Sequence, residues 1–141
     1  MTDTLDRFLE AQEHTYSTAL REIRAGQKES HWMWFIFPQM RGLGRSGMAY
    51  IYGIADCAEA EAYLAHPVLS ARLYEITEAL LSLDESDPNA IFGGIDAMKL
   101  RSSMTLFAAV GEEDSVFHQA LAKFFSGRMD QKTLELLGEI K

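Results

Sequence analysis

Apolar residues recur at helical spacing along most of the chain, and this repeat constrains the fold more than any other feature. The stripes predict helices over residues 5–25, 57–65, 67–83, 96–110, 117–126 and 131–140. Only the stretch 48–54 alternates in the manner of a strand, and it is too short to found a sheet. We therefore expect an all-α fold, a compact multihelical single domain that spans residues 1–141.

Residues suited to helix ends stand at the boundaries of these stripes. Asp56 and Asp130 precede the second and the last stripe, where a carboxylate can accept the first free N–H groups. Pro67 is acceptable at the first position of a helix, and Gly26 ends the first stripe. The acidic stretch 84–88 is interpreted as a solvated connection. These local signals set the predicted boundaries.

Charge and composition limit the partners of this chain. Its 141 residues suit one domain, with 48% apolar and 24% charged residues as in ordinary soluble proteins. The formal net charge of −8, from 13 basic and 21 acidic residues, repels nucleic acid and anionic membranes over long range. We therefore expect neither nucleic acid nor a membrane as a partner, and an anion must bind through a local basic patch.

Three features predict a cytoplasmic location. Residues 1–6 contain no basic region and no apolar core of a secretion signal. The strongly apolar run 32–37 is far too short to span a bilayer. The single cysteine, Cys57, excludes an intrachain disulfide and fits a reducing compartment.

A run of aromatic and apolar residues from His31 to Met40 leads directly into a glycine-rich loop, residues 41–47, that carries two arginines. An apolar wall beside a cationic, adaptable backbone suits a pocket for an anionic, ring-containing ligand. The same residues suit an ordinary buried turn. Exposing each large apolar side chain costs ~1.5–3 kcal/mol. We therefore expect the irregular segment 26–53 to be threaded through the domain.

The glycine-rich loop matches two known patterns in part. Gly42–Gly47 has the spacing of the dinucleotide-binding fingerprint, but that motif requires a parallel sheet around it. The glycines either let backbone N–H groups converge on an anion, with charge from Arg41 or Arg45, or form a flexible turn. Ser46 lies where a nucleophile elbow has its serine, but Met48 replaces the required glycine. Ser46 is therefore interpreted as a turn or capping residue.

Polar side chains interrupt two of the apolar stripes. Gln12 needs a hydrogen-bond partner, either a backbone carbonyl or a ligand, because an unpaired buried amide costs ~1–3 kcal/mol. Lys99, Arg101, Ser102 and Ser103 form a polar sector on the fourth predicted helix. Lysine and arginine seldom go inside without a partner, and that partner is Asp96 or a phosphate.

The histidines offer no metal site. His14, His31, His66 and His118 lie far apart and lack the close helical spacings of zinc-binding motifs. His66 is interpreted as closing a helix end. His31, beside the aromatic run, is either a packed residue or one that titrates in a pocket. We expect no metal and no cofactor.

Several blocks of the chain resemble one known family. They are residues 31–39, 42–46, 52–54, 63–67 and 99–107. They are similar to the signature blocks of the domain-of-unknown-function family 1810, and the resemblance runs from Leu5 to about Leu137. It implies a multihelical fold with a short buried central helix, which suits residues 32–37 or the segment around Tyr50. The resemblance implies no particular activity.

The first predicted helix also resembles a motif of the NADAR families, helical proteins that act on N-glycosidic bonds of ADP-ribose-type compounds. Asp6–Gln12 is similar to their Glu-His-Tyr-Phe-Gln-Ala-Gln motif, and Asp6 stands where that motif has a functional glutamate. Glu13 replaces the lysine that follows the motif. The resemblance implies hydrolysis through an oxocarbenium-like state that the carboxylate of Asp6 stabilises.

The sequence therefore predicts two kinds of function. The first is binding of a nucleotide or ADP-ribose-like anion, with hydrolysis of an N-glycosidic bond, and Asp6 is its catalytic residue. The predicted ligand-binding residues are Gln12, His31, Trp32, Trp34, Gln39, Arg45, Ser46, Lys99, Arg101 and Ser102. They surround a pocket walled by the aromatic run, the glycine-rich loop and the fourth helix. The alternative is a non-enzymatic module that binds a protein partner or a second copy of the chain as a homo-oligomer.

Overall fold

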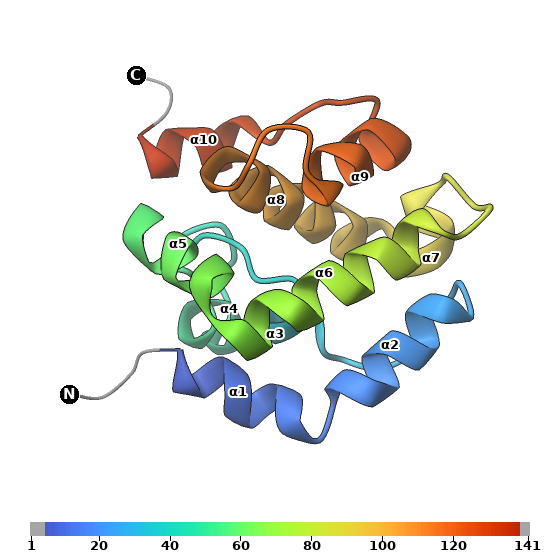
Figure 1. Ribbon diagram of the computed structural model, residues 1–141, viewed down its shortest axis with the longest axis horizontal. Coiled ribbons are helices and arrows are strands. Elements are labelled where there is room, and N and C mark those ends of the chain that lie inside the picture. The colour runs from blue at the N-terminus through green and yellow to red at the C-terminus, as the bar shows by residue number, and fades with distance from the viewer. Residues whose placement is uncertain (1–4, 139–141) are drawn as a thin grey trace.

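The computed structural model describes residues 5–138, and this range contains ten helices (Figure 1). They are α1 (Asp6–Glu13), α2 (Tyr16–Arg24), α3 (Met33–Ile36), α4 (Gly47–Ile51), α5 (Cys57–Ala65), α6 (Pro67–Leu81), α7 (Pro88–Phe92), α8 (Gly94–Val110), α9 (Val116–Phe125) and α10 (Gln131–Leu137). Met40 and Ile54 form an isolated parallel β-bridge. None of the helices in the described range has both the length and the apolar character needed to cross a membrane. The predicted all-α fold is confirmed.

The long helices α6 and α8 form the centre of the fold. Helix α8 contacts α5, α7, α9 and α10, and helix α6 contacts α2, α5 and α9. In Figure 1, α6 crosses the front of the molecule, with α1 and α2 on one side of it and α9 and α10 on the other. The predicted stripe of α6 is buried in this centre at Leu69, Leu73, Ile76 and Leu80. Its fifth predicted member, Leu83, lies beyond the end of α6 at Leu81 and is partly buried.

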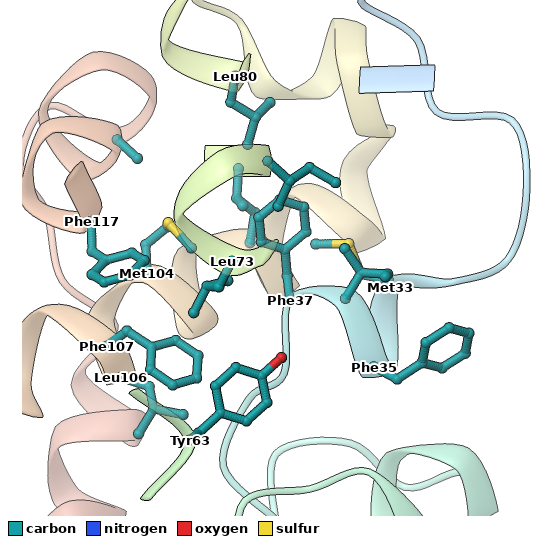
Figure 2. Close-up of a cluster of buried hydrophobic side chains, with 14 of the residues drawn as sticks. Met33, Phe35, Phe37, Tyr63, Leu73, Leu80, Met104, Leu106, Phe107 and Phe117 are labelled. Carbon is teal, nitrogen blue, oxygen red and sulfur yellow. The ribbon is translucent and has the colours of Figure 1, made fainter. Parts of the chain in front are cut away.

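Aromatic rings from several helices meet in the core (Figure 2). The ring centroid of Tyr63 in α5 lies 5.2 Å from that of Phe107 in α8, which lies 5.7 Å from that of Phe117 in α9. Phe37, which follows α3, lies 6.1 Å from Phe92 at the end of α7. Tilted and edge-on rings at these separations attract one another beyond the burial of their surface. The rings therefore hold helices distant in sequence around one core.

The short helix α3 is buried in the middle of the fold. Its residues Met33, Phe35 and Ile36 are buried, whereas α4 has no buried residue. The short buried central helix that the family resemblance implies is therefore α3, the first of the two candidate segments. As predicted, the irregular segment 26–53 is threaded through the domain, because the residues of α3 and Phe37 fill part of the core.

The predicted helix caps are present. The Oδ1 atom of Asp56 accepts a hydrogen bond from the Glu59 N–H at 2.8 Å, and the Oδ2 atom of Asp130 accepts one from the Thr133 N–H at 3.2 Å. Pro67 occupies the first position of α6. A side-chain cap of this kind is typically worth about 1 kcal/mol. Local sequence signals were therefore sufficient to place these helix starts.

The single first helix predicted for residues 5–25 is wrong. The structure has two helices there, separated by His14 and Thr15. The Thr15 N–H donates to the carbonyl of Gln12 at 3.1 Å, three residues back instead of four. This break lets α1 pack against α3 while α2 packs against α6. Apolar residues on the two sides of the break keep helical spacing, so periodicity alone does not reveal it.

Other boundaries also differ from the prediction. The acidic stretch 84–88 leads into α7, a helix that was not predicted. Pro88 is the first residue of α7, and the side chain of Asp87 accepts a hydrogen bond from the Asn89 N–H at 2.9 Å. Helix α8 begins at Gly94, two residues before the predicted start at Asp96. The predicted end of the last helix, residues 139–140, lies outside the described residues.

Candidate functional site

Two adjoining hollows lie along the N-terminal half of α8. The first, which we call the cationic hollow, has a volume of about 420 Å³ and is lined by Lys28, His31, Met33, Trp34, Phe92, Gly93, Gly94, Ile95, Asp96 and Lys99. The second, the apolar hollow, has a volume of about 370 Å³ and is lined by Gln39, Leu43, Gly44, Ile95, Met98, Lys99, Arg101, Ser102 and Asp130. The two hollows are neighbours because they share Ile95 and Lys99.

Two lysines meet one aspartate in the cationic hollow. Lys28 Nζ lies 2.8 Å from Asp96 Oδ2, and Lys99 Nζ lies 3.6 Å from Asp96 Oδ1. The local charge of these three groups is therefore positive, in a chain whose formal net charge is −8. The hollow also includes the start of α8 at Gly94, where the helix dipole is positive. These features favour an anion in the cationic hollow.

Each of these lysines also lies against a tryptophan. Lys99 Nζ is 5.0 Å from the ring centroid of Trp34, and Lys28 Nζ is 5.0 Å from that of Trp32. The two rings differ in burial, since Trp32 is fully buried whereas Trp34 is partly exposed and lines the cationic hollow. Trp34 therefore offers ring surface to a ligand, and Trp32 belongs to the core.

A buried carboxylate anchors the segment that carries Lys28. Glu22 of α2 accepts hydrogen bonds from the Glu29 N–H at 2.7 Å, the Ser30 N–H at 2.9 Å, the Ser30 hydroxyl at 2.6 Å and the Trp32 indole N–H at 2.9 Å. Burial by itself would raise the pKa of Glu22, but these hydrogen bonds outweigh it and lower the pKa to about 2. Glu22 could not be recognised in the sequence, because nothing in its spacing distinguishes it from a solvated glutamate.

The polar groups around the apolar hollow hold its walls together. The hydroxyl of Ser102 lies 3.1 Å from Asp130 Oδ2. Arg101 donates from Nε to the carbonyl of Arg128 at 2.9 Å and from Nη2 to the carbonyl of Met129 at 2.7 Å. These bonds attach the segment before α10 to α8. Arg101 and Ser102 therefore have structural roles in addition to any contact with a ligand.

The structure brings six of the predicted ligand-binding residues to these hollows. They are His31 and Trp34 in the cationic hollow, Gln39, Arg101 and Ser102 in the apolar hollow, and Lys99 in both. The walls come from the aromatic run, from the glycine-rich loop through Leu43 and Gly44, and from α8. Lys28 is an additional residue of the site that the sequence does not reveal, because it reaches Asp96 only through the tertiary fold.

Two of the predicted residues lie in the core instead. Trp32 is fully buried, and Gln12 is 1% exposed. Gln12 Nε2 donates to the carbonyl of Phe35 at 2.7 Å and to the hydroxyl of Tyr63 at 3.1 Å, and its Oε1 accepts from Arg72 at 3.3 Å. The first of the two alternatives for Gln12 therefore holds, since a backbone carbonyl is one of its partners.

Three more predicted residues lie outside both hollows. Arg45 and Ser46 are exposed in the glycine-rich loop. The hydroxyl of Ser46 accepts the Ala49 N–H at 3.1 Å and caps α4, as one interpretation predicts. Asp6 is exposed in the first turn of α1. Its catalytic role stays a prediction.

Glycines around this loop have a packing role. A Cβ at Gly44 would lie 2.6 Å from the Cβ of Ala49, and a Cβ at Gly53 would lie 2.7 Å from the Cα of Arg41. Cβ atoms in proteins essentially never lie this close to another heavy atom. The absence of side chains therefore lets the glycine-rich loop pack closely against α4 and the segment that follows it.

A third hollow, of about 590 Å³, lies between α2 and α6 and contains none of the predicted site residues. Its charged residues are Arg24, Glu75 and Glu78, and Glu75 accepts a hydrogen bond from the hydroxyl of Tyr16 at 2.5 Å. Within residues 5–138, no group of three or more His, Cys, Asp and Glu side chains is arranged to hold a metal ion.

Comparison with known proteins identifies relatives but no activity. Residues 2–137 match the family described as a protein of unknown function, DUF1810. The crystal structure of the conserved hypothetical protein Rv1873 from Mycobacterium tuberculosis has a TM-score of 0.92 and 46% sequence identity, over 95% of this chain and 96% of that chain. No curated protein matches the chain. Because the family model matches nearly the full length of the chain, and because the chain shares the fold of this crystal structure, the chain belongs to the DUF1810 family.

Proposed function

We propose that this protein binds a small anionic ligand of the nucleotide or ADP-ribose class in the cationic hollow. One observation carries the proposal: Lys28 and Lys99 converge on the single carboxylate of Asp96, and Lys99 also lies against the partly exposed ring of Trp34. Two ammonium groups that share one counter-ion leave a net positive charge that can attract a phosphate. A hydrogen bond from an ammonium group to a phosphate oxygen is charge-assisted and therefore stronger than one between neutral groups.

The size and walls of the cationic hollow fit such a ligand. Its volume of about 420 Å³ falls within the range of roughly 300–1,000 Å³ that is typical of small-molecule sites. Phosphate oxygens can accept hydrogen bonds from Lys99 and from the first turn of α8. A flat ring can pack against Trp34. His31, which is exposed at the rim, adds a further polar group.

Hydrolysis of an N-glycosidic bond is a separate prediction. The resemblance to the NADAR families assigns it to Asp6, which does not line the cationic hollow, whereas Asp96 and Asp130 line the two hollows. If Asp6 is catalytic, Asp6→Asn should abolish turnover of an ADP-ribose-type compound and leave its binding unchanged. Retained turnover would remove Asp6 from the mechanism.

A protein-interaction module is the second candidate, and exposed apolar residues favour it. Ile95 and Met98 of α8 are 76% and 72% exposed at the rim of the hollows. Large apolar side chains exposed together frequently mark a surface that binds a partner. If the protein self-associates through this surface, its sedimentation coefficient should rise with protein concentration. Met98→Asp should abolish that rise.

A thermal-shift screen with ADP-ribose, NAD and AMP tests ligand binding. A ligand at about one hundred times its Kd stabilises the protein by about 2.7 kcal/mol, which raises Tm by several degrees in a domain of this size. Lys99→Ala should remove most of the shift. Lys132→Ala, an exposed lysine of α10, is the matched control and should preserve it. Unchanged melting curves with every compound would contradict ligand binding and favour the interaction module.

A further inference from the structure

The cationic and apolar hollows are joined at Ile95 and Lys99 but differ in chemistry. The first contains the two lysines and the start of α8. The second has three apolar side chains in its wall, those of Leu43, Ile95 and Met98, beside the polar ones of Gln39, Lys99, Arg101, Ser102 and Asp130. A ligand whose phosphate contacts Lys99 therefore lies next to an apolar hollow of about 370 Å³, which has room for a further part of that ligand.

Two side chains at this junction are unusually exposed for their size. Ile95 exposes 76% and Met98 exposes 72% of its surface, although both belong to the central helix of the fold. Covering such side chains with a flat apolar group removes their surface from water, a gain that the free protein does not have. Methionine is also well suited to this contact because its thioether packs favourably against aromatic rings. These two side chains therefore favour an aromatic ring as their partner.

Gln39 supplies a hydrogen-bonding edge in the same hollow. Its backbone carbonyl accepts the Ile54 N–H at 2.9 Å, but its side-chain amide makes no hydrogen bond to any residue in the range 5–138. Gln39 is partly buried and lines the apolar hollow. A side-chain amide presents one donor and one acceptor side by side, the pattern that recognises the edge of a heterocyclic base.

We infer that the apolar hollow holds the heterocyclic base of a nucleoside phosphate whose phosphate lies in the cationic hollow. Met98 and Leu43 contact the face of the base, the amide of Gln39 pairs with its edge, and Lys99 at the junction contacts the phosphate. This inference rests on the proposed function and deepens it: the base, and not only the charge, determines which anions bind.

Calorimetric titration with AMP and with ribose 5-phosphate tests the inference, because the two probes share the sugar and the phosphate and differ in the base. Wild-type protein should bind AMP about 10-fold or more tightly than ribose 5-phosphate, the expected effect of burying apolar ring surface. Met98→Ala and Gln39→Leu should each reduce the affinity for AMP several-fold and leave the affinity for ribose 5-phosphate unchanged. Met48→Ala, an exposed methionine of α4 that does not line the apolar hollow, is the control.

The possible results separate the inference from the proposed function. If both probes bind with equal affinity and both depend on Lys99, the cationic hollow is a site and the inference about the base is wrong. If Met98→Ala and Gln39→Leu weaken both probes equally, the base does not lie in the apolar hollow. If neither probe binds, the proposed function and the inference both fail. Met98 is largely exposed, so its variant should fold normally even if Gln39→Leu perturbs the loop.

Discussion

The two halves of α8 lie on one continuous helix but have different surroundings. Each residue from Ser102 to Ala108 is buried, in contact with the helices around it. In the first half, Ile95 and Met98 are exposed, and Lys99 lies beside two hollows. The second half therefore buries its apolar residues from Met104 to Ala108 within the fold, whereas the first half buries Ala97 and Leu100 but leaves Ile95 and Met98 exposed.

The difference between the two halves indicates where a ligand site can lie in a chain without a recognised catalytic motif. Burial explains the apolar residues of the second half, because each of them removes its surface from water: Met104, Leu106, Phe107 and Ala108. Burial does not explain a pair of exposed apolar side chains beside two lysines that share one aspartate. We therefore expect substitutions of the buried residues 103–108 to change stability, and substitutions of Ile95, Met98 and Lys99 to change binding.

The largest effect on stability is expected at Phe107 in the second half. Phe107→Ala should lower the free energy of unfolding by about 3–5 kcal/mol, because it leaves a cavity between Tyr63 and Phe117. Met98→Ala in the first half should change it by less than about 0.5 kcal/mol, as is usual for exposed sites. Urea unfolding followed by circular dichroism measures both. Equal losses of unfolding free energy in Phe107→Ala and Met98→Ala would contradict the proposed difference between the two halves.

A second effect on stability is expected at Glu22, which anchors the segment that carries Lys28. The pKa of Glu22 is lowered from 4.5 to about 2 in the folded protein, so the folded state binds fewer protons than the unfolded state between these values. Its contribution of about 3 kcal/mol is present above pH 4.5 and is lost as the pH falls towards 2.

Urea unfolding between pH 6 and pH 3 tests this contribution. Glu22→Gln should be less stable than wild type at pH 6, and the gap should narrow as the pH falls. Glu113→Gln, an exposed glutamate in the turn before α9, should follow the wild-type curve. A constant gap between Glu22→Gln and wild type would show that the carboxylate does not titrate as proposed.

A smaller effect, on binding instead of stability, is expected at Asp96. Asp96→Asn removes the counter-ion that Lys28 and Lys99 share. Affinity for AMP should therefore rise, by about 1 kcal/mol or roughly five-fold for one partly screened charge. Asp84→Asn, in the exposed acidic stretch, should leave the affinity unchanged. Weaker binding by Asp96→Asn would indicate that the carboxylate orients the lysines instead of competing with the ligand.

Much of the fold could be predicted from the sequence because its signals are local. Helical spacing gave the main stripes, and Asp56, Pro67 and Asp130 marked helix starts by their own chemistry. The break at residues 14–15 could not be predicted, because it accompanies the packing of α1 on α3 and of α2 on α6, which the spacing of apolar residues does not record. Tertiary contacts of this kind do not change the spacing of apolar residues along the sequence.

The candidate site was only partly predictable, for a similar reason. The composition of the aromatic run pointed to both Trp32 and Trp34, and only the fold shows that one is buried against Glu22 while the other lines a hollow. Lys99 was found because a cation on an apolar helix is unusual. Lys28 was missed because its ion pair with Asp96 joins residues distant in the sequence.

The same pair of tryptophans provides the most direct test of the central claim, that the N-terminal half of α8 borders a ligand site. The chain has two tryptophans, so a ¹⁵N-correlated NMR spectrum contains two indole N–H signals, assigned with Trp34→Phe. Titration with AMP should move the signal of Trp34 and leave that of Trp32, which donates to buried Glu22, in place. A spectrum in which neither signal moves, or in which only that of Trp32 moves, would contradict the account.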